Sequence, residues 1–273
     1  MKIMLMTDME ACAGVLNAAD WVVPGGHSYE QGKRLLTEET NAAIDGLFAG
    51  GATEVLVVDG HGAGGINPEL LDERALLMRG FANPPYPLGL DASFAALAFV
   101  GQHAKAGTPR SHLTHTQWWS YIDLAVNGIS IGEYGQTALC AMELGIPTIL
   151  ACGEAAFAAE AAALTPGVVT VTVKWGLLED GLDDLDGEAY SRAKLGAIHL
   201  SPQRARRLIR DGALQAVTRL REAPQSFGYP DLRPPYIRTA RFRHDGATPA
   251  STARDEHPSS FIALMNLPYT KVS

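Results

Sequence analysis

Residues 28–58 read SYEQGKRLLTEETNAAIDGLFAGGATEVLVV, a helical pattern followed by a short apolar strand. The helical part, Ser28–Phe48, is followed by Gly50-Gly51, which ends it. Its apolar side chains recur at helical spacing and form one stripe: Leu35, Leu36, Ile44, Leu47 and Phe48. Glu54–Val58 reads as a strand, and Ile3–Met6 reads as another strand before the helix. This order predicts a parallel strand pair joined by a crossover helix.

The same alternation of strands and helices continues along the chain. Further strands are expected at residues 75–78, 95–100, 121–126, 148–152 and 168–173, and further helices at residues 135–144, 154–164 and 201–221. Asn127-Gly128 tolerates the positive φ angles of a type I′ turn, so residues 121–126 and 129–131 are expected to form an antiparallel hairpin. We predict an α/β fold with a largely parallel sheet flanked by helices, a β-hairpin and a smaller C-terminal module.

The character of the chain changes after residue 222. Residues 223–235 hold four of the sixteen prolines, which is typical of a linker. We predict a main α/β domain over residues 1–222, and a linker with a small C-terminal module over residues 223–273. Six acidic residues lie between Trp175 and Tyr190 without the ligand spacing of an EF-hand, so a solvated loop is expected there rather than a calcium site.

Composition excludes several classes of protein. With 22 basic and 30 acidic residues the net charge is −8, which disfavours nucleic acid and anionic membrane surfaces as partners. No apolar run approaches the roughly 18 residues of a membrane-spanning helix. The N-terminus reaches Asp8 too soon for a signal peptide, and the three cysteines form no Cys-x-x-Cys pair, so a cytoplasmic protein is expected.

Acidic and histidine side chains follow several of the expected strands. They are Asp8 and Glu10, Asp59 and His61, His103, and Glu133 after the hairpin. Because ligands of parallel sheets bind outside the carboxyl ends of the strands, these side chains are expected to converge on one crevice. Such a mixture of oxygen and nitrogen donors suits zinc or manganese, and a carboxylate such as Asp8 can bridge two ions that activate a water. A purely structural role for these strand-end residues is the alternative.

His115 is a separate candidate, because it lies in the polar segment Ser111–Thr116 before Trp118-Trp119. A histidine beside a metal pair can donate a proton to a leaving amine or stabilise an oxyanion. His112 is expected to be a surface or interface residue. Glu154 follows another strand and either lines the site or interacts with the dipole of the next helix.

A competing motif occupies the same region. Gly60–Gly65 fits G-x-G-x-x-G after a strand, the arrangement that binds a dinucleotide pyrophosphate. Asn67 and Pro68 resemble the N-cap and first residue of a helix. The last glycine of the motif, Gly65, would then precede the helix, whereas the dinucleotide-binding motif places it in the first helical turn. A nucleotide-binding oxidoreductase is therefore the weaker interpretation.

Several short motifs together resemble the DppA-type zinc D-aminopeptidases. In chain order they are Thr7-Asp8-Met9-Glu10, Val58-Asp59-Gly60-His61-Gly62, Gly101-Gln102-His103-Ala104, Thr114-His115-Thr116, Asn127-Gly128 and Gly132-Glu133-Tyr134-Gly135. The resemblance extends from residue 1 to about residue 174. It weakens afterwards, because residues 176–190 resemble an insertion and the tail from Pro234 lacks the strand and helix pattern expected at the family's C-terminus.

This resemblance implies a site and an activity. It implies that two zinc ions, for which manganese or cobalt can substitute, are bound by Asp8, Glu10, His61, His103 and Glu133, with Asp8 bridging. His115 would be the catalytic histidine. The implied activity is removal of N-terminal D-residues from short peptides and amides by a homodecamer of two stacked five-membered rings.

The prediction for this chain is therefore a metal-dependent aminopeptidase or amidohydrolase whose site lies within residues 1–222. Two alternatives remain. One is the nucleotide-binding oxidoreductase built on the 60–65 loop, and the other is a non-catalytic metal-binding assembly protein.

Overall fold

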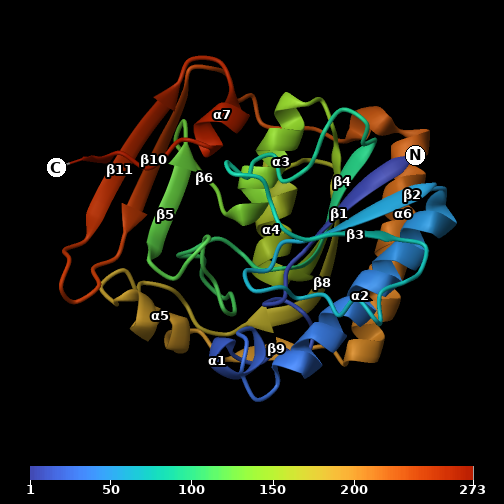
Figure 1. Ribbon diagram of the computed structural model, residues 1–273, viewed down its shortest axis with the longest axis horizontal. Helices are drawn as coiled ribbons and strands as arrows, with labels where there is room; N and C mark the ends of the chain where they lie inside the picture. The colour runs from blue at the N-terminus through green and yellow to red at the C-terminus, as the bar shows by residue number, and fades with distance from the viewer. Residues whose placement is uncertain (273) are drawn as a thin grey trace.

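In the computed structural model, which describes residues 1–272, the chain forms two β-sheets (Figure 1). The larger sheet has the strand order β3-β2-β1-β4-β7-β8-β9, and all neighbours are parallel except β8 and β9. Its strands are β1 (Lys2–Thr7), β2 (Glu54–Asp59), β3 (Leu76–Met78), β4 (Ala96–Gln102), β7 (Thr148–Glu154), β8 (Val169–Gly176) and β9 (Ala197–His199). The predicted α/β fold with a largely parallel sheet is confirmed.

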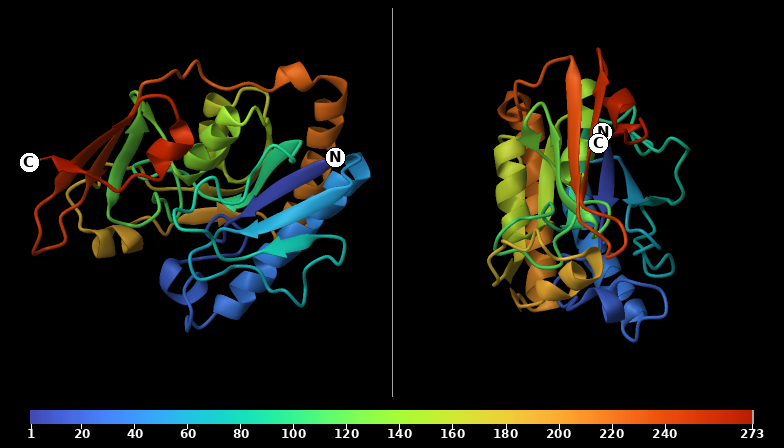
Figure 2. Two further views of the ribbon diagram at one scale, coloured as in Figure 1. Left: turned by 45° about the horizontal axis from the view of Figure 1, so that its top comes forward. Right: turned by 90° about the vertical axis from the view of Figure 1, so that its left-hand side faces the viewer.

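The second sheet is antiparallel, with the order β12-β11-β10-β5-β6. Its strands are β5 (Tyr121–Val126), β6 (Ile129–Ser130), β10 (Tyr236–Phe242), β11 (Ser251–His257) and β12 (Lys271–Val272). The helices of the molecule are α1 (Ala18–Trp21), α2 (Tyr29–Gly50), α3 (Glu133–Glu143), α4 (Ala155–Leu164), α5 (Gly187–Ala193), α6 (Pro202–Glu222), the 3₁₀ turn η1 (Pro224–Ser226) and α7 (Phe261–Met265). Figures 1 and 2 show the second sheet at the end of the molecule opposite α2 and α6.

Helices cover both faces of the parallel sheet. In β1, Ile3 and Leu5 pack in the core with α2 and α6, whereas Met4 and Met6 pack in the core with α3 and α4. Both faces are buried, which explains why the central strands are continuous apolar runs. Helices α2 and α6 lie side by side (Figure 1), and a Cβ at Gly46 would lie only 2.2 Å from the Arg210 carbonyl oxygen. Glycine at this position permits their close packing.

The order of the strands creates a switch point between β1 and β4. From β1 the chain passes to β2 and β3 on one side, and it returns at β4 on the other side of β1. The connections after β1 and β4 therefore diverge and leave a crevice at the carboxyl ends of these strands. Asp8 and His103 directly follow these two strands.

The predicted hairpin is present. Strands β5 and β6 pair antiparallel, and Asn127 and Gly128 both have positive φ, at 49° and 81°. Helix α3 begins at Glu133, two residues before the expected start. Strand β7 continues to Glu154, which occupies the N-cap position of α4 without a capping hydrogen bond from its side chain.

The expectation of a tail without a strand and helix pattern is wrong. Strands β10 and β11 and helix α7 form there, and β10 pairs with β5 from the middle of the chain. The alternating pattern of these strands was hidden because two of their buried positions are charged. Arg238 and Asp255 form a buried ion pair at 2.7 Å, at positions where apolar residues would be expected.

The acidic segment is also more ordered than a solvated loop. Residues Gly187–Ala193 form α5. The Asp180 carboxylate lies 2.6 Å from the buried Lys194 ammonium, and this ion pair anchors the segment. Among residues 1–272, no helix combines the length and the apolar character needed to span a membrane.

Candidate metal centre

The five candidate metal ligands and His115 lie together at the switch point, whereas Asp59, also expected there, does not join them. Five of the six are buried, with less than a tenth of their surface exposed, and Glu133 is half-buried at the start of α3. Two overlapping groups offer ligand atoms within 4.8 Å of one another: Asp8, Glu10 and His103, and His103, His115 and Glu133. His61 lies outside these groups but contacts the first one.

Asp8 connects the two sides of the cluster. Its Oδ1 lies 3.2 Å from Nδ1 of His61, and its Oδ2 lies 3.3 Å from Nε2 of His103. The same His61 nitrogen lies 3.2 Å from Oε2 of Glu10. Each carboxylate oxygen of Asp8 therefore faces a different histidine.

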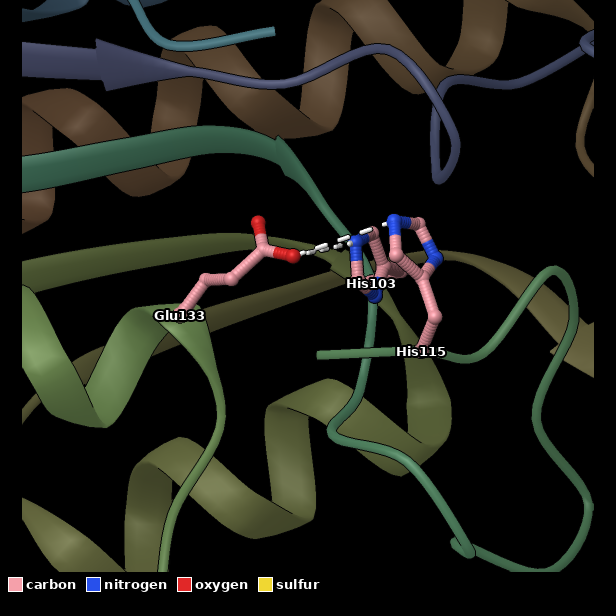
Figure 3. Close-up of side chains that lie close together, drawn as sticks. All are labelled: His103, His115 and Glu133. Atoms are coloured by element: carbon pink, nitrogen blue, oxygen red, sulfur yellow. Dashed lines mark ion pairs between the residues drawn. The ribbon is translucent and has the colours of Figure 1, made fainter. Parts of the chain in front are cut away.

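The second side of the cluster is drawn in Figure 3. Glu133 Oε1 lies 3.6 Å from Nε2 of His103 and 3.8 Å from Nε2 of His115. The two imidazoles stack with their centres 4.0 Å apart, and Trp119 packs on the other face of His115 at 4.2 Å. The His115 ring is thus held between two rings, with one nitrogen toward Glu133.

Each histidine has one ring nitrogen fixed by a backbone carbonyl. His61 Nε2 donates to Val22 O at 2.6 Å, His103 Nδ1 to Ala104 O at 2.8 Å, and His115 Nδ1 to Leu113 O at 2.8 Å. The other nitrogen of each ring faces the carboxylates. This is the arrangement in which histidine binds a metal, because the second hydrogen bond fixes the tautomer and the ring orientation.

The electrostatics of the cluster favour positive charge. Burial opposes a charged imidazole at His61, but the Glu10 charge and the Asp8 hydrogen bond raise its pKa to about 12. The pKa of His103 is also raised, since Glu133 and Asp8 outweigh burial. Without metal, these two histidines hold protons that balance the carboxylates. A divalent cation can replace such protons.

The donor set fits a divalent metal. Glu10 Oε2 and His103 Nε2 are buried and make no hydrogen bond of acceptable geometry. Buried polar atoms normally make well-formed hydrogen bonds, so two ligand atoms that make only ion-pair contacts indicate a missing partner. Carboxylates and imidazoles together suit zinc or manganese.

Asp59 supports the 60–65 loop and does not join the cluster. Its carboxylate accepts the backbone N–H of Gly65 at 2.9 Å and of Ile66 at 3.3 Å. From the other side, Arg79 donates to the carbonyls of Asp59 and His61. The nucleotide interpretation fails here because residues 66–75 contain no helix and the N–H groups of Gly60, Gly64 and Gly65 already have partners within the protein.

Several supporting residues escaped the sequence analysis. Gln102 donates to Asp8 Oδ2 at 2.9 Å. Lys174 is fully buried, and its ammonium donates to the backbone carbonyl of Glu10 at 2.6 Å. Gln102 ends β4 and Lys174 lies within β8, but a lone polar residue in a strand gives no signal of its target. They fix the positions of two candidate ligands.

Glu154 and His112 have structural roles. Glu154 is buried and accepts the backbone N–H of Ala104 at 3.0 Å and of His112 at 2.6 Å, so it holds both loops that carry His103 and His115. The expectation of an exposed His112 is wrong. This side chain is buried, with Nε2 donating to Leu16 O at 3.1 Å and Nδ1 3.2 Å from the Lys174 ammonium.

Two chambers open from the cluster and share Asp8, Gly60, Gln117 and Glu133. The inner chamber has a volume of about 210 Å³ and an apolar wall formed by Met6, Phe81, Pro85, Tyr86 and Leu88. The outer chamber has a volume of about 350 Å³ and is lined by His61, His115, Val22, Val23, Trp118 and Trp119, among others. Each chamber thus has room for a small molecule beside the cluster.

Gly101 determines how closely β4 approaches Asp8. Its φ is +76°, and a Cβ there would lie 1.9 Å from the Asp8 carbonyl oxygen. Gly101→Ala is therefore expected to displace Asp8 and to weaken zinc binding by about 10- to 100-fold, the usual effect of disturbing a ligand's support. Gly128→Ala is the matched control, because Gly128 also has positive φ but no atom within 4 Å of its Cβ position. Equal zinc affinities of the two variants in a competition titration would contradict this packing argument.

Comparisons with known proteins agree with this geometry. A D-aminopeptidase of Bacillus subtilis (strain 168) is 34% identical over 176 residues. The matched segment is 64% of this chain and also 64% of that protein, so the chain spans less than two thirds of this relative. The structure of the Zn-dependent D-aminopeptidase DppA from Bacillus subtilis, described as a self-compartmentalizing protease, is similar with a TM-score of 0.82 and 26% identity. The similarity covers 97% of this chain and 95% of that one. Residues 1–248 match the Peptidase_M55 family, described as D-aminopeptidase, and the chain therefore belongs to this family.

Proposed function

We propose that this protein is a metal-dependent aminopeptidase that removes N-terminal amino acids, preferentially those of the D configuration, from short peptides and amides. The proposed ligands of two zinc ions are Asp8, Glu10, His61, His103 and Glu133. His115 is the proposed catalytic histidine. The family membership and the zinc-dependent D-aminopeptidase of similar structure support this assignment.

The position of Asp8 is the observation that carries the proposal. Its two carboxylate oxygens face different histidines, His61 and His103, at 3.2 and 3.3 Å. A carboxylate placed in this way could bridge two divalent ions, which would acidify a water between them. Glu10 beside His61 and Glu133 beside His103 then complete one set of donors on each side.

The chemistry follows from the donor set and the neighbouring residues. When bound, a pair of divalent ions acidifies water and polarises a carbonyl oxygen. Burial lowers the pKa of His115, and its Nδ1 donates to Leu113 O, so Nε2 is the nitrogen left to accept a proton. The same nitrogen can then return the proton to the leaving amine. Trp119 and His103 hold the ring in place for both steps.

The chambers limit the size of the substrate. Asp8 and Glu133, both proposed metal ligands, line both of them. The chambers, of about 210 and 350 Å³, accommodate only short segments on either side of the cluster. These features support an exopeptidase acting on small substrates. Cys12, Cys140 and Cys152 are free and buried, which supports the further proposal of a reducing, cytoplasmic location.

Metal content and hydrolysis together test the proposed function. Protein purified without chelators or a histidine tag is expected to contain about two zinc, manganese or cobalt ions per chain by plasma mass spectrometry, and to hydrolyse D-dipeptides or D-amino-acid amides. Asp8→Ala is expected to lose metal and activity together. Glu69→Ala, at an exposed carboxylate outside the cluster, should change neither.

Two results would contradict the proposal. Metal content near zero that added zinc does not restore would mean that the cluster is not a metal site. Normal metal content without hydrolysis of any D- or L-peptide, amide or ester would favour the alternative of a non-catalytic metal-binding assembly protein.

The role of His115 has its own test, because this residue also lies within 4.8 Å of His103 and Glu133 as a possible ligand. His115→Ala is expected to keep near-normal metal content and to lower kcat by about 10²-fold or more, as for other acid–base groups. His244→Ala, in the loop after β10, serves as the control. Undiminished kcat would exclude the catalytic role, and loss of metal would make His115 a ligand instead.

The protein is also proposed to assemble, as a homodecamer by resemblance to the family. Exposed apolar side chains gather where β8 and β9 end the parallel sheet: Trp175, Leu177, Leu178, Leu195 and Ile198. Ile198 is 58% exposed and lies opposite Trp175 in the strand pairing. A patch of this kind at a sheet edge supports contact with another subunit.

The mass in solution tests the assembly. Light scattering is expected to give about 291 kDa for ten chains of 29.1 kDa. Ile198→Asp is expected to lower this mass by placing a charge in an apolar contact, whereas Leu76→Asp, at an exposed position in β3 on the opposite edge of the sheet, is the control. A single species of 29.1 kDa would contradict the proposal.

A further inference from the structure

The two chambers differ in their relation to His115. His115 lines the outer chamber and is absent from the wall of the inner chamber. If His115 returns a proton to the leaving amine, the leaving part of the substrate must occupy the outer chamber. The N-terminal residue then lies on the other side of the cluster, in the inner chamber.

The inner chamber has the size and chemistry of a side-chain pocket. A cavity of about 150 Å³ lined by apolar side chains can hold benzene, and this chamber measures about 210 Å³. Its lining includes no basic side chain, and Asp8 and Glu133 lie where it joins the cluster. An apolar side chain as large as leucine or phenylalanine fits the wall of Met6, Phe81, Pro85, Tyr86 and Leu88, whereas an acidic side chain would find no basic partner in the lining.

We propose that the inner chamber selects the side chain of the substrate's N-terminal residue and that Tyr86 sets the size it accepts. This inference rests on the proposed aminopeptidase function. Tyr86 forms part of the apolar wall together with Phe81 and Leu88, and its hydroxyl accepts a hydrogen bond from Gln117 Nε2 at 3.4 Å. Because Gln117 also donates its backbone N–H to Glu133 at 2.7 Å, the Tyr86 side chain is connected to the metal cluster.

The position of Tyr86 depends on the C-terminal part of the chain. Asn266, directly after α7, accepts the Tyr86 backbone N–H at 3.0 Å and donates to the Tyr86 carbonyl at 2.9 Å. This pair of hydrogen bonds fixes the Tyr86 backbone on both sides of its Cα. Asn266 is therefore a positioning residue for the chamber wall, although it is not part of the lining.

Two dipeptide series measured on the metal-loaded protein test the proposal. In the first series the N-terminal residue varies (X-Ala), and in the second the C-terminal residue varies (Ala-X), with X being alanine, leucine, phenylalanine or glutamate in both configurations. The wild type is expected to prefer leucine over glutamate in X-Ala by at least about tenfold in kcat/KM, within the range that pocket contacts supply.

Tyr86→Ala is expected to raise the ratio of kcat/KM for Phe-Ala over Ala-Ala by about tenfold, with metal content and the Ala-X ratios unchanged. Asn266→Ala should shift the X-Ala ratios in the same direction by a smaller factor. Leu70→Ala, at an exposed position outside both chambers, should shift neither series. Tyr86→Trp, which has a larger aromatic ring, should lower the ratio of kcat/KM for Phe-Ala over Ala-Ala. This variant serves as the test if Tyr86→Ala does not fold.

The outcomes separate this inference from the proposed function. A wild type that hydrolyses no peptide although it contains metal refutes the aminopeptidase function itself. A wild type that hydrolyses dipeptides, with X-Ala ratios that neither Tyr86 variant changes, overturns the assignment of the inner chamber alone. A change confined to the Ala-X series would mean that the chambers are occupied in the opposite order.

Discussion

Repulsion among carboxylates at the carboxyl edge of the sheet is the constraint on which this structure depends. Asp8 and Glu10 have oxygens within 4.8 Å of each other and are buried. At that distance two negative charges repel by about 3–4 kcal/mol even with an effective dielectric constant of about 20. The chain must therefore supply positive charge at this point. Protonated histidines can supply it in the metal-free protein and divalent ions in the loaded one, which explains why each carboxylate has an imidazole beside it.

Much of the surrounding structure holds these charges in place. Asp8 directly follows β1, and its backbone N–H donates to the Val100 carbonyl of β4 at 3.0 Å. Buried Lys174 fixes the Glu10 backbone, and Arg79 fixes the loop that carries His61. Since these contacts come from β8 and from the segment after β3, the site requires nearly the whole parallel sheet. The switch point between β1 and β4 thus determines where the cluster lies, and distant elements determine its geometry.

The sequence predicted the parts of the fold and site that depend on local patterns. Apolar runs identified the strands, and polar residues at their ends identified Asp8, His61 and His103, because strand ends of a parallel sheet meet at one edge. Contacts across long sequence separations were not predictable. Lys174 reaches Glu10 over 164 residues, and the Arg238–Asp255 ion pair replaces the apolar alternation that would have revealed β10 and β11. In both cases a charged residue has a buried partner that no local pattern specifies.

The chemistry and the proposed selection of substrates come from different parts of the chain. The candidate ligands follow β1, β2 and β4 or begin α3, where the parallel sheet and its flanking helices restrict movement. The wall of the inner chamber comes largely from residues 81–88, which form no regular helix or strand and are held by Asn266. A substitution near α7 can therefore move this wall without replacing any candidate metal ligand. Such a division allows side-chain preference to change among relatives while the reaction is preserved, because loops tolerate variation better than the sheet that carries the ligands.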